Sequence, residues 1–480
     1  MPADVGSDGW IGPHPQGWEA FYKFEKIAAI VVAGLALYLA TTESLGWVPI
    51  AIGAFAAFVM LFVHWPYGAV LELLIAGSVP RWIIPIGSWN AKPEHFVAAA
   101  CGLTLLVRTF TQKHEWKAFG RVEWLLLAFL AMNFFSSAVA SPEPSSTLRW
   151  ALLLTLAVSP LFLICQVVGT PEQLDKAVLL WLWVGALAAL FGILCFISHL
   201  LFRTSFGVTF FGYLDFIPGV HGSLWEPNIF GSYCSCFAVM FLFYFLDGVQ
   251  KNGWYLAGFL LTTVGGMLSL ARQGWICLIS VGSLVLLLHL RRSKIRLKHL
   301  VPIVGSVLLA FVVGVTVMVD LSERMASLTV ETAEEDPTVL RRLGLVGLAM
   351  DDIQEHPLIG LGTSSFQLMY VAETDASYTG VDKAWLGSLF FEEMHDTGLI
   401  GMILFLWVIV DLGRRAWRVL ATPGRSSGRT AVGALSAGVL VMLIAYQITD
   451  ASTLALTWIQ FGLMAAALRI AESRSKAVPL

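Results

Sequence analysis

An arginine lies close to the middle of an otherwise almost wholly apolar stretch, from Trp254 to Leu290. The local sequence SLARQGWICL, residues 269–278, places Arg272 and Gln273 between two apolar runs. The planar guanidinium group of arginine offers donors in a fixed fork, which suits phosphate oxygens better than the ammonium group of lysine does. Arg272 is therefore a candidate for binding a phosphate or diphosphate group. The alternative is a side chain that only reaches lipid phosphates at a membrane surface.

Two adjacent arginines, Arg341 and Arg342, lie at the start of a predicted short helix from about Thr338 to Glu355. His356-Pro357 ends this helix, because the residue before a proline is disfavoured in the helical conformation, and a glycine-bearing loop follows. Positive charge in the first turn of a helix opposes the helix dipole, and an anion bound nearby would explain that cost. The alternative is ion pairing with the acidic residues at 334–336.

The segment LGSLFFEEMHDTGLIG, residues 386–401, carries groups able to take a proton from an attacking hydroxyl. Glu392, Glu393 and His395 lie just before the next apolar run. Carboxylate and imidazole groups are common general bases in enzymes. The alternative is that these residues form the solvated end of a helix.

The segment HGSLWEPNIFGSY, residues 221–233, ends a loop and enters a helix, because its Glu-Pro-Asn sequence is a turn and helix-start signal. His221, Glu226 and Asn228 are the polar residues of this segment that we consider for substrate binding. The same pattern is also that of a simple helix cap.

The composition places these residues in a membrane protein. Of 480 residues, 57% are hydrophobic and 13% are charged, compared with about 45 to 50% and about 25% in soluble domains. Several apolar runs reach the length of about 20 residues that crosses the bilayer as a helix. Only helices and closed barrels satisfy the backbone in lipid, and long apolar runs without polar alternation exclude a barrel. The sequence predicts an all-α, polytopic integral membrane helical bundle.

The apolar runs predict about 12 to 14 transmembrane helices. Residues 67–87, interrupted by Gly77 and Pro80, read either as one more broken span or as a helix on the membrane surface. The other candidate spans lie near residues 27–41, 47–65, 95–107, 122–140, 149–168, 174–200, 228–248, 254–271, 274–290, 300–319, 398–413, 430–449 and 453–470.

The basic residues predict how the bundle is oriented. Lysine and arginine favour the cytoplasmic side of short loops, and they gather at residues 291–299, 414–418 and 469–476. These segments are expected in the cytoplasm. Counting the predicted spans outward from these basic segments puts Arg272 and the loop at 201–228 on the opposite face of the membrane. In a bacterium this face is the periplasm or the exterior.

The long segment at 320–397 is expected on the same outer face as Arg272. It carries twelve acidic residues between Asp320 and Asp382. A translocated insertion of this length in a bundle with short loops is more often functional than a linker. We expect one membrane domain over residues 1–480, with a large periplasmic loop that contains short helices.

The remaining features of the sequence exclude several classes. The six cysteines lie within apolar segments, where they act as small hydrophobes, and they indicate neither disulfides nor a metal site. Residues 1–25 lack the pattern of a removable signal peptide, and the net charge of -3 points to no nucleic-acid partner. Polar residues gather at the outer surface rather than near the bilayer midplane, where a transporter would more often carry them.

Four of these stretches resemble, in the same order, the bacterial O-antigen ligase and polymerase superfamily of glycan-transferring membrane proteins. The resemblance covers roughly residues 200–415. It implies a GT-C-like glycosyltransferase that uses polyprenyl-diphosphate-linked glycans, in which arginines hold the donor diphosphate. It also implies that an acceptor hydroxyl attacks the anomeric carbon with inversion, without a cofactor or an essential metal. The stretches are GSLWEPNIFGSY, SLARQGW, RRLGLVGLAMDDIQEHPLIGLG and EMHDTGLIGMILFL.

The resemblance also assigns the diphosphate-binding arginines. Arg272 matches the arginine of the family's Ser-Arg-Gly-like hairpin motif, with Ala271 where serine is common. Arg342 matches the arginine ahead of the HPLIGLG segment, and Arg341 is the second choice at this position.

One departure from the family pattern concerns the acceptor. Ligases of the family typically carry a His-Asn pair ahead of the glycine that corresponds to Gly398, and this chain has Gly387 and Ser388 at those positions. The departure leaves the group of Glu392, Glu393 and His395 to activate the acceptor, and it favours a polymerase of repeat units over a ligase.

The expected function is polymerisation of the repeat units of a surface polysaccharide or exopolysaccharide in a bacterial inner membrane. The expected partners are an undecaprenyl-diphosphate-linked oligosaccharide donor, a glycan or lipid acceptor, membrane lipids and a chain-length regulator. The alternatives are a ligase that joins the glycan to a lipid or protein, a flippase for lipid-linked glycans, and a scaffold that uses the acidic loop for docking. A flippase should have a polar cavity through the membrane, and a scaffold would not need paired outer-face arginines.

Overall fold

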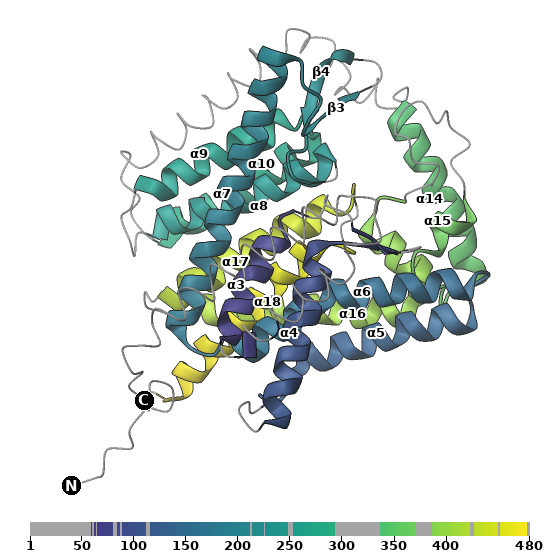
Figure 1. Ribbon diagram of the computed structural model, residues 1–480, viewed down its shortest axis with the longest axis horizontal. Helices are drawn as coiled ribbons and strands as arrows, with labels where there is room; N and C mark the ends of the chain where they lie inside the picture. Colours follow the sequence, from purple (N-terminus) through teal and green to yellow (C-terminus); the bar gives the residue numbers. More distant parts are fainter. Residues whose placement is uncertain are drawn as a thin grey trace, which may run out of the picture.

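The computed structural model describes residues 59, 62–63, 65–79, 84–86, 89–111, 116–211, 214–224, 226–247, 253–292, 337–370, 386–422, 427–449 and 452–477. Over these residues the chain is mostly helical, with two short antiparallel hairpins (Figure 1). The helices are α3 (Pro66–Ala76), α4 (Pro93–Phe110), α5 (Arg121–Val139), α6 (Pro144–Val167), α7 (Pro171–Phe202), α8 (Pro227–Asp247), α9 (Gly253–Leu268), α10 (Arg272–Arg292), α14 (Pro337–Glu355), α15 (Ser365–Met369), α16 (Leu389–Ala421), α17 (Ser427–Ala445) and α18 (Ala455–Ala477). The strands are β1 (Ile84–Ile86), β2 (Trp89–Ala91), β3 (Val208–Phe211) and β4 (Leu214–Val220).

The protein is a polytopic helical membrane protein, as the sequence predicts. Among the described residues, seven helices are long and apolar enough to cross a membrane, namely α5, α6, α7, α8, α10, α16 and α17. Helix α9 is apolar but shorter, and α4 and α18, where the sequence also predicts spans, are not among the seven. The predicted spans near 27–41, 47–65 and 300–319 lie wholly or almost wholly outside the described residues.

Proline marks the start of many of these helices. A proline at the first helical position loses no hydrogen bond, because the first backbone N–H groups of a helix have no partner within it. Pro227 begins α8, which confirms the helix start predicted at residues 226–228. Helix α14 ends at Glu355, which confirms the predicted stop before His356-Pro357. The other described helices that begin at proline are α3, α4, α6, α7 and α14.

Helix α8 forms the centre of the bundle and packs against α7, α9, α10 and α17. Of its apolar span, 83% is buried. Phe230, Phe237 and Phe241 fill this core, and the ring of Trp181 lies 5.1 Å from that of Phe237. Dense packing around α8 holds its first residues in place, and these belong to the candidate site.

Residues 67–87, predicted as a broken span or a surface helix, do not form a surface helix over their described part. Helix α3 ends at Ala76 and is packed within the bundle, where Val70, Leu73 and Leu74 are buried. The hairpin of β1 and β2 follows it, with Ile84 opposite Ala91. A helix with apolar residues on all sides is stable in a core, so its pattern did not distinguish a surface position from a buried one.

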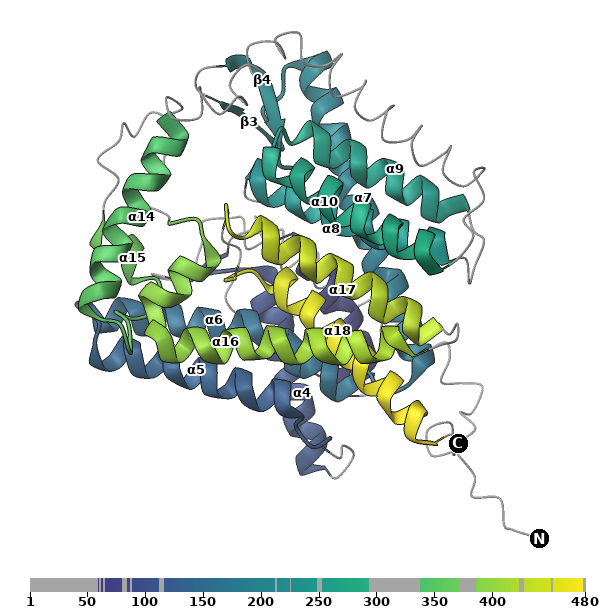
Figure 2. The same ribbon diagram turned by 180° about the vertical axis from the view of Figure 1, so that it is seen from behind.

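The two ends of the bundle carry different residues. We call the end at which α8 and α10 begin and α17 ends the Arg272 end. The opposite end is held by ion pairs, in which Arg415 makes two hydrogen bonds with Glu472, 2.9 and 3.0 Å long, and Arg469 pairs with the buried Glu123. Figure 2 shows α16 lying alongside α5 and running away from α14.

Helices α14 and α15 lie beside the Arg272 end of α5, α6 and α16 (Figures 1 and 2). They are held by a small apolar cluster of Ala349, Phe366 and Leu386 that is separate from the main core. These two helices fall within the predicted outer loop at 320–397, whose residues 320–336 and 371–385 lie outside the described residues.

Helix α4 begins with a buried acid. Glu94 is 1% exposed, and neither of its carboxylate oxygens has a hydrogen-bond partner in the part of the chain that the structure describes. Burial raises the pKa of Glu94 from 4.5 to about 7, although Lys92 nearby acts in the opposite direction. A buried carboxyl without partners costs folding free energy when it ionises.

Candidate functional site

The candidate site is built around a break in helix α16. The backbone at Gly398 has φ 62° and ψ -166°, so the helix is interrupted after Thr397. The carbonyl groups of His395 and Asp396, freed by the break, accept hydrogen bonds of 2.9 Å from the N–H groups of Leu361 and Gly362. Buried backbone groups need such partners. The break in α16 is therefore stable only because the loop that crosses it supplies these hydrogen bonds.

The loop at residues 357–362 crosses α16 at very short range. The N–H groups of Leu399 and Ile400 donate back to the carbonyls of Pro357 and Leu358, at 2.8 and 3.2 Å. A Cβ atom at Gly398 would lie 2.4 Å from the carbonyl carbon of Leu358, which is closer than packed atoms allow. Gly360, with φ 66°, makes the matching approach from the loop. The glycine-bearing loop predicted after α14 is confirmed, and its role is to strap the two parts of α16.

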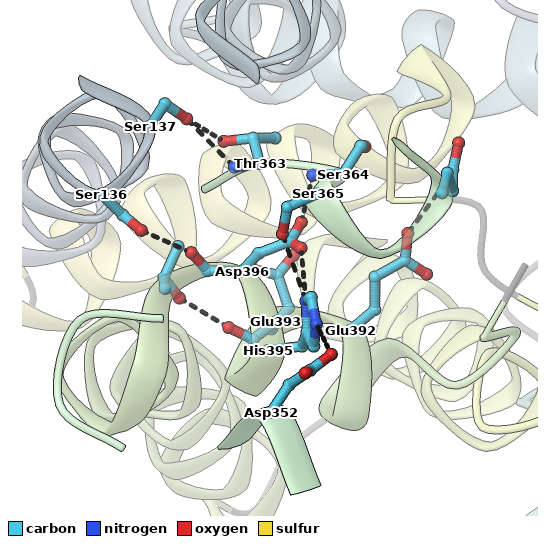
Figure 3. A network of polar contacts seen from close by, with 12 residues as sticks. Ser136, Ser137, Asp352, Thr363, Ser364, Ser365, Glu392, Glu393, His395 and Asp396 are labelled. Carbon is cyan, nitrogen blue, oxygen red and sulfur yellow. Dashed lines mark hydrogen bonds and ion pairs between the residues drawn. The ribbon is translucent and has the colours of Figure 1, made fainter. Parts of the chain in front are cut away.

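Helix α5 anchors the same loop from the other side (Figure 3). Ser136 Oγ donates to the carbonyl oxygen of Asp396 at 2.7 Å. Thr363 N–H donates to Ser137 Oγ at 3.0 Å, and Thr363 Oγ1 donates to Asn133 Oδ1 at 2.8 Å. These small polar residues of the apolar helix α5 therefore fix the position of the loop along α5.

His395 lies at the centre of the polar network in Figure 3. Its Nε2 is 3.0 Å from Asp352 Oδ2, and its Nδ1 is 3.2 Å from Ser365 Oγ and 3.5 Å from Asp396 Oδ1. The residue is 1% exposed, and its ring meets the ring of Phe366 edge to face at 5.3 Å. Both ring nitrogens therefore already have protein partners.

Asp352 and Asp396 fix the elements around the imidazole. The hydroxyl of Tyr370 donates to Asp352 Oδ2 at 2.9 Å, and burial followed by this hydrogen bond raises the pKa of Tyr370 to about 12. Asp396 Oδ2 accepts a hydrogen bond from the N–H of Ser364, the residue before α15. A carboxylate at the start of a helix satisfies N–H groups that have no partner within the helix.

Glu392 and Glu393 lie one turn before His395 on the first part of α16. Their residues are 6% and 5% exposed. Gln367 Nε2 donates to Glu392 Oε1 at 3.3 Å, which orients this carboxylate from α15. The structure therefore places Glu392, Glu393 and His395 together, as the sequence predicts, but in a packed site rather than at a solvated helix end.

Arg272 is the first residue of α10 and is half-buried. The sequence places it in the connection between two spans, whereas the connection consists of residues 269–271 and Arg272 already belongs to the helix. Leu270 takes a positive φ of 58°, which is uncommon for leucine. Ser269 supports this turn by donating to the carbonyl of Gly266 at 2.6 Å and accepting from the N–H of Ala271 at 3.2 Å. The tight turn fixes where the Arg272 backbone begins.

The Arg272 turn is attached to the start of α8. Gln273 Nε2 donates to the carbonyl of Asn228 and to Ser232 Oγ, both at 3.2 Å. Gly274 packs against Gly231, where an added Cβ would lie 2.9 Å from backbone atoms. The two predicted motifs at 221–233 and 269–275 are therefore one structural unit.

The three polar residues predicted on the 221–228 segment have different surroundings. His221 is 1% exposed, and its Nδ1 lies 3.1 Å from the carbonyl of Leu224, so it stabilises the turn before α8. Glu226 accepts a hydrogen bond of 2.6 Å from Thr449 Oγ1. The backbone carbonyl of Asn228 accepts the hydrogen bond from Gln273 Nε2, and this is the contact by which Asn228 supports the Arg272 turn.

Hydrogen bonds through the end of α17 connect this unit to the first part of α16. Thr449, the partner of Glu226, follows α17 closely. Tyr446, three residues earlier, accepts a 2.7 Å hydrogen bond from the N–H of Leu389. Ser388 Oγ donates to Gln447 Oε1 at 3.4 Å. The Arg272 turn and the His395 network thus lie at the same end of the bundle and share one set of supports.

Arg341 and Arg342 lie in α14, but their side chains are outside what the structure describes. Because α14 begins at Pro337, both arginines fall in its second turn, not in the first turn that the sequence suggests. The helical period puts position 342 on the same face as Ala349 and Ile353, which are buried against the bundle. Position 341 lies towards the edge of that face.

Sequence reasoning missed several residues of this network. Asp352, Ser365, Gln367 and Tyr370 were not expected at the site, and they contact residues at least 18 positions away along the chain. The available signal was Asp352 itself, an acidic residue on the side of α14 that carries apolar residues. Within the described residues, no group of three or more His, Cys, Asp or Glu side chains is arranged to hold a metal ion.

Comparison with known proteins agrees with the resemblance seen in the sequence. Residues 257–406 match the family model described as O-antigen ligase. The matched part includes the Arg272 turn, α14, α15 and the break at Gly398, so it contains most of the network described above. A comparison with curated proteins gives no match. Enzymes of the matched family transfer lipid-linked glycans. The chain therefore carries an O-antigen ligase family domain at residues 257–406.

Proposed function

We propose that the protein polymerises glycan repeat units, by moving a glycan from a polyprenyl diphosphate to a hydroxyl of an acceptor sugar at the Arg272 end. The observation that carries this proposal is the shared support of the Arg272 turn and the Glu392 segment through Thr449 and Tyr446. A guanidinium group and an oriented carboxylate at one end of the bundle suit the two halves of this reaction. One group stabilises the leaving diphosphate, and the other accepts the proton of the attacking hydroxyl.

The proposed step keeps atoms and charges balanced. The acceptor oxygen forms a bond with the anomeric carbon while the bond from that carbon to the phosphate oxygen breaks. Negative charge grows on the diphosphate, where Arg272 and an arginine of α14 stabilise it without reorganisation. The proton of the hydroxyl passes to a carboxylate, for which we propose Glu392, because Gln367 orients it. Attack from the face opposite the phosphate inverts the anomeric centre.

We place the Arg272 end outside the cytoplasm, in the periplasm of a bacterium whose inner membrane holds the protein. The support for this orientation is the positive-inside rule. Helix α10 ends in Arg291-Arg292, and α16 carries Arg414, Arg415 and Arg418 near its end, all at the end of the bundle opposite Arg272. Lipid-linked glycans in the outer leaflet would then meet the site directly.

Gly387 supports polymerisation over ligation. This residue, at the position where ligases of the family typically carry histidine, has φ 69°. Glycine adopts this conformation readily, whereas other residues are strained in it. The departure from the ligase pattern is therefore built into the backbone as well as the sequence. A ligase stays the second candidate, because the matched family model is described as O-antigen ligase.

Purified full-length protein in lipid nanodiscs, supplied with polyprenyl-diphosphate-linked repeat units, tests the proposal. Polymerisation predicts a ladder of longer lipid-linked glycans without any second acceptor. Transfer only after a lipid or protein acceptor is added would identify a ligase instead. Movement of the lipid-linked glycan between leaflets without new glycosidic bonds would identify a flippase, and no change in the substrate would favour a scaffold.

A further inference from the structure

One carboxylate oxygen joins α14 to two other segments of the site. Asp352 Oδ2 lies 3.0 Å from Nε2 of His395 (Figure 3). The same oxygen accepts a hydrogen bond of 2.9 Å from the hydroxyl of Tyr370. Tyr370 follows α15, and His395 belongs to the first part of α16. A carboxylate only accepts hydrogen bonds, so the imidazole Nε2 donates. We call Asp352, Tyr370 and His395 the α14 latch.

The far side of His395 is held as firmly as the side that meets Asp352. Its Nδ1 lies 3.2 Å from Ser365 Oγ, and its ring packs edge to face against Phe366. The residue is 1% exposed. With Asp396 Oδ1 at 3.5 Å from Nδ1 as well, the imidazole would have to break three polar contacts and leave its packing before it could reach an acceptor hydroxyl. Its geometry suits a support better than a base.

Within the described residues, the loop at 357–362 holds the C-terminal end of α14 to α16, and the body of the helix has few other attachments. One face packs on the small cluster of Ala349, Phe366 and Leu386. The opposite face meets no part of the chain that the structure describes, since a Cβ at Gly344 or Gly347 would have no described atom within 4 Å. Among the described side chains, the latch therefore joins the body of α14 to α16 and, together with that loop, sets the angle of the helix.

The angle of α14 determines where its arginines lie. Arg342 precedes Asp352 by ten residues on the same helix, which is about 15 Å of helix axis at 1.5 Å per residue. A pivot of about 10° at the latch would move position 342 by roughly 3 Å over that length. Misplacement of a binding group by about 1 Å is enough to cost about a hundredfold in rate.

We propose, resting on the proposed function, that the α14 latch positions Arg342 for the donor diphosphate and that His395 is a positioning residue, not the acceptor base. The latch acts only through α14. Its loss therefore weakens binding of the diphosphate and leaves the acceptor side intact. Asp352 and Tyr370 become positioning residues of the same site.

Binding of polyprenyl diphosphate to the purified full-length protein tests the latch without requiring turnover. We expect Asp352→Asn to weaken binding about tenfold, within the range of coupling between residues that act together. Asp351→Asn removes the same charge from an exposed position of the same helix and should bind as the wild type does. Tyr370→Phe removes a single hydroxyl group and should weaken binding in the same direction by less. If Asp352→Asn fails to fold, the binding of polyprenyl diphosphate by Tyr370→Phe tests the latch instead.

The Arg342→Ala background separates positioning from other roles. If the latch acts through Arg342, Asp352→Asn causes no further weakening in that background. An equal loss in both backgrounds, or an equal loss with Asp351→Asn, overturns the latch. The same variants should raise the Michaelis constant for the donor more than that for the acceptor.

Spin labels at Leu348 on α14 and Val139 on α5, both exposed, report the position of α14 directly. Asp352→Asn should shift or broaden the distance between them, and an unchanged distance overturns the latch. Failure of the proposed function would look different. The wild type would then bind no polyprenyl diphosphate, while the label distance would still respond to Asp352→Asn.

Discussion

His395 Nε2 lies 3.0 Å from Asp352 Oδ2 and joins two helices whose contacting residues are 43 positions apart. The contact lies beside Glu392, at the end of the bundle where Arg272 begins α10. An acid, an imidazole and an oriented carboxylate thus lie at the same end of the bundle as a candidate diphosphate-binding arginine.

Removing a proposed diphosphate-binding arginine should slow glycan transfer strongly. We expect Arg272→Ala and Arg342→Ala each to lower the rate by on the order of 100- to 1000-fold, about 3 to 4 kcal/mol, because a fixed donor to the developing charge is lost. The measurement is the initial rate with lipid-linked repeat units at equal amounts of inserted protein. Arg414→Ala, at an exposed position near the opposite end, is the matched control and should retain activity. If Arg272→Ala transferred glycan at the wild-type rate, Arg272 would not be a diphosphate-binding residue.

Substituting the proposed base should separate two neighbouring acids. Glu392→Gln keeps the shape of the side chain but removes the proton acceptor, and we expect a loss of roughly 100- to 10000-fold. Gln367→Ala, which removes the group that orients Glu392, should cost less. Initial rates for Glu392→Gln and Glu393→Gln decide between the two acids. Greater loss in the Glu393 variant would move the role of base to that residue.

A side chain at the break in α16 should destabilise the protein. In Gly398→Ala, the new Cβ would lie 2.4 Å from the Leu358 backbone, at a φ of 62° that alanine rarely adopts. We expect a lower melting temperature in detergent, equivalent to at least about 1 kcal/mol. Gly413→Ala lies in the same helix with no atom within 4 Å of the new Cβ, and it should leave stability unchanged or raise it. Equal melting temperatures for the two variants would contradict this account of the break.

Restoring the ligase-type histidine should not produce a ligase. Gly387 has φ 69°, and a histidine there would be strained by about 1 to 2 kcal/mol. We therefore expect Gly387→His to lower thermal stability and to transfer no glycan to a second acceptor. Assays with and without a lipid acceptor measure both products. A stable variant that has changed from polymerisation to acceptor transfer would show that the histidine alone decides the reaction.

The buried acid at the start of α4 should make stability depend on pH. The pKa of Glu94 in the folded protein is raised from 4.5 to about 7, so the protonated form favours folding. Its contribution is complete below about pH 4.5 and is lost as the pH rises through 7. Glu94→Gln stays neutral at every pH and should be more stable than the wild type above pH 7, by at most on the order of 3 kcal/mol.

Melting curves of the two proteins at pH 5 and pH 8 measure this effect. We expect nearly equal melting temperatures at pH 5 and a higher melting temperature for Glu94→Gln at pH 8. A constant difference at both values would mean that Glu94 does not titrate in this range.

The sequence predicts the membrane helices well, because a long apolar run has few other stable structures. Proline and the Glu-Pro-Asn and His-Pro patterns also locate the start of α8 and the end of α14 to within a residue. The short strands of the two hairpins carry too few residues to give a periodic pattern, so they were not expected. The burial of α3 was missed for a related reason, since an apolar helix looks the same on a surface and in a core.

The site could be predicted only in part. The presence of Glu392, Glu393 and His395 in one short segment is visible in the sequence, whereas the break at Gly398 is not. The sequence predicts a span that begins near residue 398, and the break there depends on a loop supplied by residues 357–362. The partnership of His395 with Asp352 depends in turn on how α14 folds back, which no local pattern encodes.

The crossing of the 357–362 loop at Gly398 also determines how this protein can be recombined with a relative. Residues 389–397 bond with the loop after α14 and with α5, whereas residues 399–421 run along the bundle as an ordinary membrane helix. A chimera that exchanges α16 from end to end would separate the polar segment from the loop that completes its backbone. Chimeras joined at Gly398, with residues 352–370 and 388–398 transferred as one block, keep those bonds. The natural crossover point for such chimeras thus lies inside a helix.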